Sequence, residues 1–360
     1  MRSAQASVVK LGDDRYRVFV EAGRDFATGK RKRKSKTVRG SRKDAERMKV
    51  KLLAEIGEVE TAQQTMTLNA FFADMYMPDA RRRLRKTTWF NYERHYDNLV
   101  RPHLGSRHLG EISPYMVTQM VNSIEGQAKR FEAFKMLRQV MRKAVKWELA
   151  DENPCERVDV PKRPRYSPNV LTAEEANIYI RHFRGHPIEA AVLIAIGGGL
   201  RRSEIAALDW RDVSEDGAVE IDDAITTVDG RPHHDTTKTE FSQRIVHLPA
   251  SITARLNELR GDPGNPVLME SGHRMNPDRI STLYARHAKK APGAKYVPLK
   301  NLRHTSLTLA LEGGTDLLAV SRRAGHANVS ITSAYYLRPS EKLDIAAASS
   351  LDGLLGAESR

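Results

Sequence analysis

Cationic side chains stand at several expected helix starts in the sequence, ahead of two adjacent tyrosines near its C-terminal end. Arg201 follows three glycines, which let a chain approach a neighbour closely, and Glu204 lies three residues further on the same expected helix face. His326 follows a glycine at another expected helix start, where exposed N–H groups attract anions. This arrangement indicates contact with an anion, and it raises the question whether Tyr335 or Tyr336 is a nucleophile.

Lys238, Lys300 and Arg303 belong to the same candidate set. Lys238 is expected in a turn between strands, where a lone lysine is ordinarily a solvated side chain. Lys300 and Arg303 open a helix whose leucines can form its buried stripe, so neither cation is needed for packing. The neighbouring His304 fits a structural role as well as a catalytic one.

Other reactive groups are few in the sequence. There is no P-loop, no spaced set of zinc ligands and no carboxylate cluster, so we expect neither a metal nor a cofactor. His233 and His234 are expected in a solvated polar turn. Cys155 is the single cysteine, which excludes an internal disulfide, and we expect it to be structural.

The composition favours an anionic polymer as partner. Among 360 residues, 59 Lys and Arg stand against 45 Asp and Glu, giving a formal charge of +14. No apolar run approaches the roughly 20 residues of a membrane span, and the N-terminus lacks the apolar stretch of a signal peptide. We therefore expect a cytoplasmic, nucleoid-associated protein that does not contact a membrane.

The pattern of elements predicts a multidomain α+β protein. Residues 1–57 are expected to form a small three-stranded sheet with one helix, capped by Ser41, and residues 65–160 an all-helical domain. Residues 168–345 are expected to form a mostly helical domain with a small antiparallel sheet, followed by a tail at 346–360. The polar segment 58–66 is expected to be a linker, as is the proline-rich segment before residue 168.

A dense basic run lies in the N-terminal part. Between residues 30 and 51 there are twelve Lys or Arg against two acids, on an expected strand and the following helix. Such density favours nucleic-acid contact over a merely solvated face. The candidate DNA-binding residues are Lys30, Arg31, Lys32, Arg33, Lys34 and Lys36.

Four segments resemble, in order, the signature boxes of the tyrosine recombinase, or phage integrase, family. They are GGLRRSEIAALDW, TKTEFSQRIVHLP, LKNLRHTSLTLA and AGHANVSITSAYY. The front of the chain extends the resemblance, because residues 1–57 look like the arm-binding domain of integrases and residues 65–160 like their core-binding domain. Residues 168–345 would then be the catalytic domain.

The resemblance implies a site-specific DNA recombinase that integrates, and also excises, a mobile element such as a prophage. A tyrosine would cleave one strand to give a 3′-phosphotyrosyl link, which retains the bond energy, so neither metal nor ATP is required. Arg201 and Arg303 would bind the phosphate, since guanidiniums stay charged and hold phosphate with paired hydrogen bonds. Lys238 would protonate the departing 5′ oxygen, and His326 would donate to a non-bridging oxygen.

Within the resemblance, the commonest spacing selects Tyr335 as nucleophile, with Tyr336 as the alternative. Lys300 stands where the family more often has histidine. A lysine can neutralise phosphate, but it acts as a base near neutral pH only if its pKa is strongly lowered, so general-base duty at this position is open. Gly198 and Ala324 stand where threonine and leucine are usual, and we expect both to be packing changes.

The resemblance also implies partners and leaves two alternatives. The expected partners are double-stranded DNA at core and arm attachment sites, a homotetramer on that DNA, an excisionase and a host DNA-bending protein. One alternative is a topoisomerase-like enzyme that relaxes a single duplex by the same chemistry. The other is a catalytically inactive DNA-binding regulator.

Overall fold

The computed structural model describes residues 5–24, 31–163, 167–236, 243–326 and 328–336, together with positions 345, 348 and 349. Contacts divide the chain into two compact units, Met1–Arg165 and Tyr166–Arg360, and each is described by itself. Among the described residues, no helix is both long enough and apolar enough to cross a membrane.

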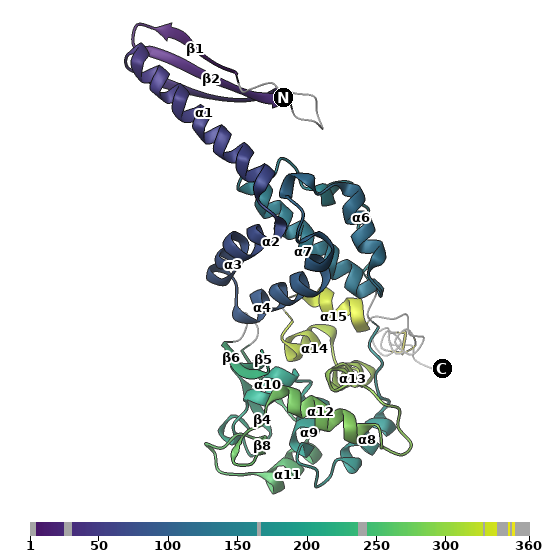
Figure 1. Cartoon of the computed structure of the whole chain (residues 1–360). Coiled ribbons are helices and arrows are strands. Elements are labelled where there is room, and N and C mark those ends of the chain that lie inside the picture. Colours follow the sequence, from purple (N-terminus) through teal and green to yellow (C-terminus); the bar gives the residue numbers. More distant parts are fainter. Residues whose placement is uncertain are drawn as a thin grey trace, which may run out of the picture. The chain divides into compact units, whose positions relative to one another are not determined.

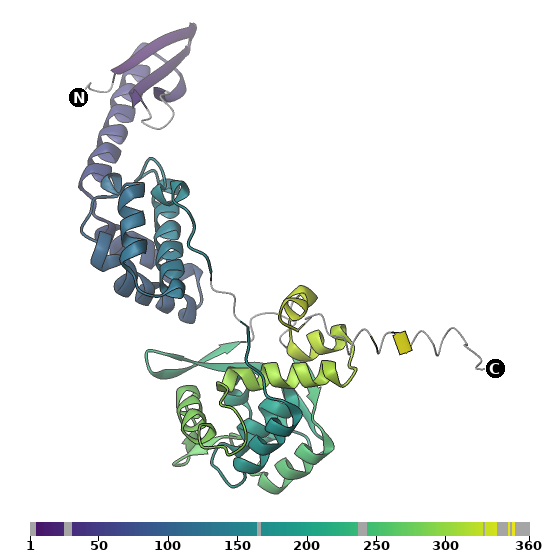
Figure 2. The ribbon, with the colours of Figure 1, turned by 90° about the vertical axis from the view of Figure 1, so that its right-hand side faces the viewer.

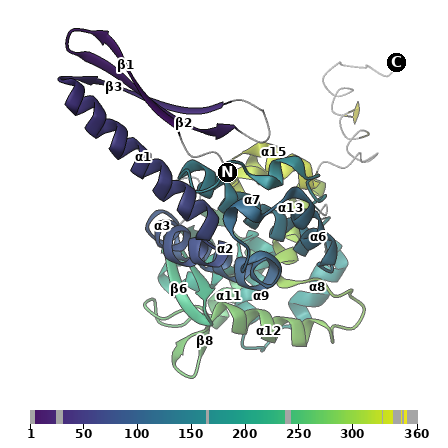
Figure 3. The ribbon, with the colours of Figure 1, turned by 45° about the horizontal axis from the view of Figure 1, so that its top comes forward.

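The first unit begins with an antiparallel sheet in the order β1-β2-β3, with β1 at Gln5–Gly12, β2 at Arg15–Arg24 and β3 at Arg31–Arg39. Helix α1 (Arg42–Thr65) lies along one face of this sheet (Figures 1 and 3). Val18 and Val20 are fully buried on that face. Ser41 precedes α1, and its hydroxyl accepts from the backbone N–H of Asp44 at 3.3 Å, which confirms the expected cap.

Helix α1 continues further than expected. The segment 58–66, expected to be a linker, is helical as far as Thr65, and α1 thus leads from the sheet to the helical bundle of the same unit (Figure 2). The segment contains Glu, Gln and Ala, which have high helix propensity, so its largely polar composition did not exclude a helix.

The rest of the first unit is helical, as predicted. Its elements are α2 (Leu68–Ala70), η1 (Phe71–Tyr76), α3 (Met77–Arg83), α4 (Lys86–His95), η2 (Tyr96–Val100), α5 (Arg101–Leu104), η3 (Leu109–Glu111), α6 (Pro114–Ser123), α7 (Gln127–Lys146) and η4 (Pro154–Arg157). Helix α7 buries Met136, Leu137, Val140 and Met141, the apolar face that its periodicity predicts. Cys155 is 1% exposed, and burial raises the pKa of its thiol to about 12, in keeping with a structural cysteine.

The second unit is mostly helical with short strands. Its elements are α8 (Ala173–His182), α9 (Glu189–Gly198), α10 (Arg202–Ala207), η5 (Trp210–Asp212), β4 (Ala218–Ile221), β5 (Asp223–Val228), β6 (Arg231–Thr236), β7 (Arg244–His247), α11 (Ala250–Leu259), β8 (Met269–Glu270), β9 (His273–Arg274), α12 (Pro277–Ala288), α13 (Leu299–Glu312), α14 (Leu317–Ala324) and α15 (Val329–Tyr336). Thr172 and Glu175 form the predicted capping box at the start of α8. Helix α9 is buried along its whole length and forms the centre of the core.

The described strands of this unit form three antiparallel pairs, β4 with β7, β5 with β6 and β8 with β9. Asp229 and Gly230, at φ 52° and 72°, make the turn between β5 and β6. His233 and His234 therefore lie in strand β6, and the expectation that they occupy a turn was wrong. The sequence does contain the turn signal, Asp-Gly, but it comes before these histidines.

Candidate active site

The glycines that end α9 bring its backbone against α13. Gly199 is left-handed, at φ 68°, and its carbonyl accepts a hydrogen bond from Arg303 Nη1 at 2.8 Å. A Cβ atom on Gly199 would lie 3.3 Å from Ser306 Oγ on α13. The glycines thus permit the close approach that the sequence predicts.

Arg201 is the residue that precedes α10, and Glu204 fixes it from the first turn of that helix. The backbone N–H of Arg201 donates to Glu204 Oε2 at 2.7 Å, and its Nη1 donates to Glu204 Oε1 at 2.7 Å. Its Nη2 donates to the carbonyl of Gly325 at 3.2 Å. Glu204 therefore orients Arg201, as the shared helix face suggests.

Glu204 also binds a second arginine. It is 3% exposed, and Arg244 at the start of β7 donates to its Oε2 from Nη2 at 2.9 Å and to its Oε1 from Nη1 at 3.2 Å. Burial alone would raise the pKa of Glu204, but the hydrogen bonds and charge of Arg244, with the charge of Arg201, outweigh burial and lower it to about 2. The carboxylate is therefore ionised near neutral pH and holds two guanidiniums together.

Arg303 lies on α13 and is 7% exposed. Its guanidinium reaches the end of α14, where Arg201 also binds. Its Nη2 donates to the carbonyl of Ala324 and lies 3.1 Å from His326 Nε2. The carbonyl of Arg323 accepts from Arg244 Nε at 2.8 Å. The last carbonyls of α14 and that of Gly325 thus each accept from a different arginine.

His326 lies directly after Gly325, which ends α14 at φ 59°. Its Nδ1 is 2.8 Å from the hydroxyl oxygen of Thr332 in α15. Burial, with the charges of Arg303 and Arg201, lowers the pKa of His326 to about 4. The imidazole is therefore neutral near pH 7 in the free protein.

Lys300 and His304 lie one turn apart on α13. Lys300 is exposed, whereas Arg303 on the same helix is buried. Burial, with the charges of Arg303 and Lys300, lowers the pKa of His304 to about 4, so this histidine is also neutral near pH 7.

Three other predicted site residues are described only in part or not at all. Lys238 lies outside the described residues, between β6 and β7. Tyr335 and Tyr336 are the last two residues of α15, and their side chains lie outside what the structure describes. The structure therefore brings together Arg201, Arg303 and His326, and places the tyrosine helix directly after the histidine.

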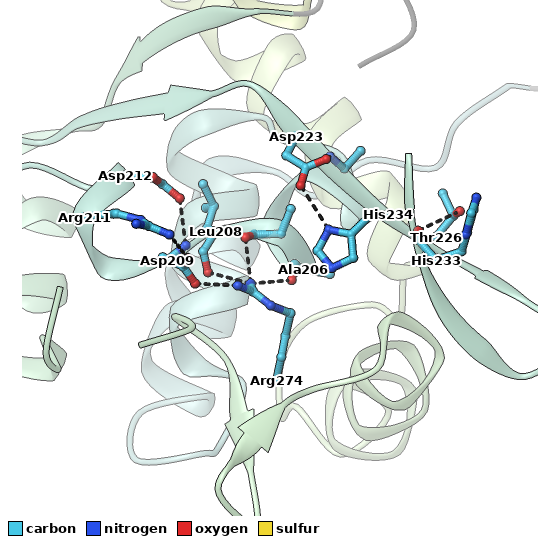
Figure 4. A network of polar contacts seen from close by, with 12 residues as sticks. Ala206, Leu208, Asp209, Arg211, Asp212, Asp223, Thr226, His233, His234 and Arg274 are labelled. Carbon is cyan, nitrogen blue, oxygen red and sulfur yellow. Dashed lines mark hydrogen bonds and ion pairs between the residues drawn. The ribbon is translucent and has the colours of Figure 1, made fainter. Parts of the chain in front are cut away.

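The sequence did not identify Arg274 as a functional residue. Its side chain caps the C-terminal end of α10. Its Nη1 donates to the carbonyls of Ala206, Ala207 and Leu208, where α10 ends, and its Nη2 donates to Asp209 Oδ1 (Figure 4). A cation at a helix C-terminus also offsets the helix dipole. Beside it, His234 Nδ1 lies 3.1 Å from Asp223 Oδ2. No local sequence pattern marks Arg274, because its partners lie far away along the chain.

The basic strand β3 is a second candidate surface. Lys34 and Lys36 are exposed, and Lys34 Nζ forms an ion pair with Glu148 Oε2 at 3.0 Å. Lys30 lies outside the described residues. Arg31, Lys32 and Arg33 belong to β3, but their side chains are not described. Across the described residues, no group of three His, Cys, Asp or Glu side chains could hold a metal ion.

Comparisons with known proteins point to one family. The profile of the Phage integrase family matches residues 169–342, and that of the phage integrase N-terminal SAM-like domain matches residues 70–124. A XerC-like tyrosine recombinase of Caldanaerobacter subterraneus subsp. tengcongensis is 25% identical, and the alignment covers 97% of this chain and 99% of that protein.

Solved structures share the fold. The Tn1549 transposon integrase, in complex with a circular intermediate DNA, matches with a TM-score of 0.66 at 18% identity, over 80% of this chain and all of that one. A lambda integrase tetramer bound to a Holliday junction matches with a TM-score of 0.60 at 18% identity, over 87% of this chain and 94% of that one. From both profiles and the end-to-end alignment it follows that the chain belongs to the phage integrase family of tyrosine recombinases.

Proposed function

We propose that this site-specific recombinase cleaves and rejoins DNA with Tyr335 as its nucleophile. The proposal rests on one observation, the meeting of Arg201, Arg303 and His326 at the end of α14, with the tyrosine helix α15 following at once. Two guanidiniums and an imidazole at one point form a site for a phosphodiester.

Each side chain has a defined part in the proposed step. The oxygen of Tyr335 attacks phosphorus and gives its phenolic proton to Nε2 of the neutral His326, which then donates to a non-bridging oxygen. The bond to the 5′ oxygen breaks, and that oxygen leaves as a hydroxyl with a proton from Lys238. The charge that grows on the non-bridging oxygens is met by Arg201 and Arg303. Reversal of the step, with a 5′ hydroxyl of a partner duplex as attacking group, rejoins the strands without ATP. Lys300, exposed on α13, adds positive charge beside the phosphate.

A nicked substrate that traps the covalent adduct tests the choice of nucleophile. We expect Tyr336→Phe to form the adduct and Tyr335→Phe to form none, because phenylalanine lacks the attacking oxygen. Each is the matched control of the other, being the same change one residue apart. Adduct formation by Tyr335→Phe, with none by Tyr336→Phe, would transfer the role to Tyr336.

We further propose that residues 1–57 bind a separate arm site on DNA through the face of the sheet that α1 leaves open. Val18 and Val20 point toward α1, so Arg17 points away from it, since side chains alternate along a strand. The register places Arg15 opposite Arg39 on that open face. We expect Arg17→Gln to weaken binding of arm DNA and to lower its salt dependence, measured by titration at several salt concentrations.

The proposed assembly is a homotetramer on two duplexes, as strand exchange requires four cleavages. The lambda integrase tetramer of the same fold supports this. Two DNA-binding regions in one chain raise the effective concentration of the second site once the first is bound, most of all when the DNA is bent. We include an excisionase and a host DNA-bending protein among the proposed partners, and the nucleoid in the cytoplasm as the place of action.

Paired attachment sites separate this function from the two alternatives. A recombinase yields exchanged duplexes, whereas relaxation of supercoils without exchange would favour a topoisomerase-like enzyme. DNA binding with no covalent adduct on a nicked substrate would favour an inactive regulator.

A further inference from the structure

Thr332 connects the tyrosine helix to the phosphate site. It lies in α15, three residues before Tyr335, and its side chain is fully buried. Its hydroxyl oxygen is 2.8 Å from Nδ1 of His326, the residue that connects α14 to the segment leading into α15. One hydrogen bond thus joins the histidine to the helix that carries both tyrosines.

The direction of this hydrogen bond follows from the neighbouring arginine. A guanidinium can only donate, and Arg303 Nη2 lies 3.1 Å from His326 Nε2, so Nε2 must present its lone pair. A neutral imidazole carries one proton, which is therefore on Nδ1. His326 Nδ1–H then donates to Thr332 Oγ1, and the hydroxyl is the acceptor.

We propose that Thr332 is a positioning residue that selects the tautomer and orientation of His326 and docks the tyrosine helix against the phosphate site. With Nδ1 bonded to Thr332, Nε2 is the nitrogen that faces Arg303 and the phosphate site, and a proton gained by the ring during the reaction is added there. This role rests on the proposed function, since it is exerted on the strand-cleavage step.

The tautomer gives a readout that does not depend on activity. In the full-length protein labelled with 15N-histidine, the signals of His326, identified by their loss in His326→Gln, should show a protonated Nδ1 and an unprotonated Nε2. Imidazole in water favours the opposite tautomer. In Thr332→Val, which keeps the shape of threonine and removes the acceptor, we expect this signature to be lost, and in Thr332→Ser to be kept.

Activity provides the second readout, on a nicked substrate that traps the adduct. We expect Thr332→Val to form the adduct about tenfold more slowly, the size found when a group that orients an active-site histidine is removed, and Thr332→Ser to recover most of the rate. Ser333→Ala is the matched control. Ser333 is the next residue of α15, and its hydroxyl donates to the carbonyl of Ser330 at 3.1 Å instead of to the histidine, so its removal should change neither readout.

Each result bears on the proposal. A proton on Nε2 of His326 in the free wild-type protein would overturn it, whether or not the variants fold. So would Thr332→Val with unchanged tautomer and rate, or Ser333→Ala with an equal loss. If the wild-type protein has the expected tautomer, lost in Thr332→Val, but forms no adduct, the proposed function fails while the contact of Thr332 with His326 stands.

Discussion

Glu204 is the buried charge on which the arrangement of Arg201 and Arg244 depends, and Glu204→Gln is the change that removes only that charge. Glutamine has nearly the same shape as glutamate, so loss of packing is small. The substitution leaves two guanidiniums side by side with no carboxylate, and the side chain of Arg244 is 8% exposed. We expect a large loss of stability, confined to the second unit.

The size of the effect follows from the pKa. A pKa lowered from 4.5 to about 2 means that the ionised Glu204 adds roughly 3 kcal/mol to the free energy of unfolding at neutral pH. Removing one partner of a buried ion pair typically costs about 3–5 kcal/mol, because the other charge stays buried. In a unit of this size each kcal/mol shifts the melting temperature by about 2–4 °C, so we expect a fall of roughly 10 °C.

The sign of the pH dependence is also fixed. The folded pKa of Glu204 lies below the unfolded value, so its contribution is complete above about pH 4.5 and is lost as the pH falls toward 2. Glu204→Gln should abolish this part of the acid sensitivity. The stability of the variant should change less than that of the wild type over this range.

Calorimetry of the full chain measures the melting of the second unit, and the thiol of Cys155 reports the first. Because Cys155 is the only cysteine and is 1% exposed, its labelling during heating follows unfolding of the first unit and should not change. Glu220→Gln, the same substitution at an exposed position of β4, is the matched control and should cost less than about 0.5 kcal/mol. Equal effects of Glu204→Gln and Glu220→Gln would refute the reasoning.

Three further outcomes are expected. Arg303→Lys should lower adduct formation about 10²- to 10³-fold while core-DNA binding, measured by filter retention, changes far less, because lysine cannot replace a guanidinium that donates in several directions at once. The lowered pKa values of His304 and His326 mean that the unfolded chain takes up protons first, so the urea midpoint of the second unit should fall as pH drops from about 6.5 to 4, and His326→Gln should reduce that fall. Cys155 should resist alkylation by iodoacetamide at pH 8 in the native protein and react fully in urea, as mass spectrometry would show.

Local patterns predicted much of the fold. The capping box of Thr172 and Glu175 and the buried face of α7 depend on neighbours within one or two helical turns, so the sequence contains the whole signal. The order of the four signature segments likewise indicated that Arg201 and Arg303 share one site. The structure gives the physical reason, since the carbonyl of Gly325 accepts from Arg201 and those of Gly199 and Ala324 accept from Arg303, where α9 and α14 end.

Partners that are far apart in the sequence could not be predicted. Arg244 looks like an ordinary basic residue at the start of a strand, and only the fold brings it to Glu204. Thr332 is one of several hydroxyl residues in its segment, and nothing local sets it apart until its contact with His326 is seen. Arg274 was missed for the same reason, because its acceptors are backbone carbonyls, which every residue has.

The acceptors at the end of α14 have a consequence for sequence divergence. Arg244, Arg303 and Arg201 are received there by the carbonyls of residues 323, 324 and 325, and a substitution alters side chains without deleting a carbonyl. Replacement of the usual leucine by Ala324 is one such change. Gly325 is the exception, because its φ of 59° disfavours other residues. Side-chain changes at residues 323 and 324 that the packing around the buried Ala324 accepts should therefore leave the arginines aligned, as long as the glycine is kept.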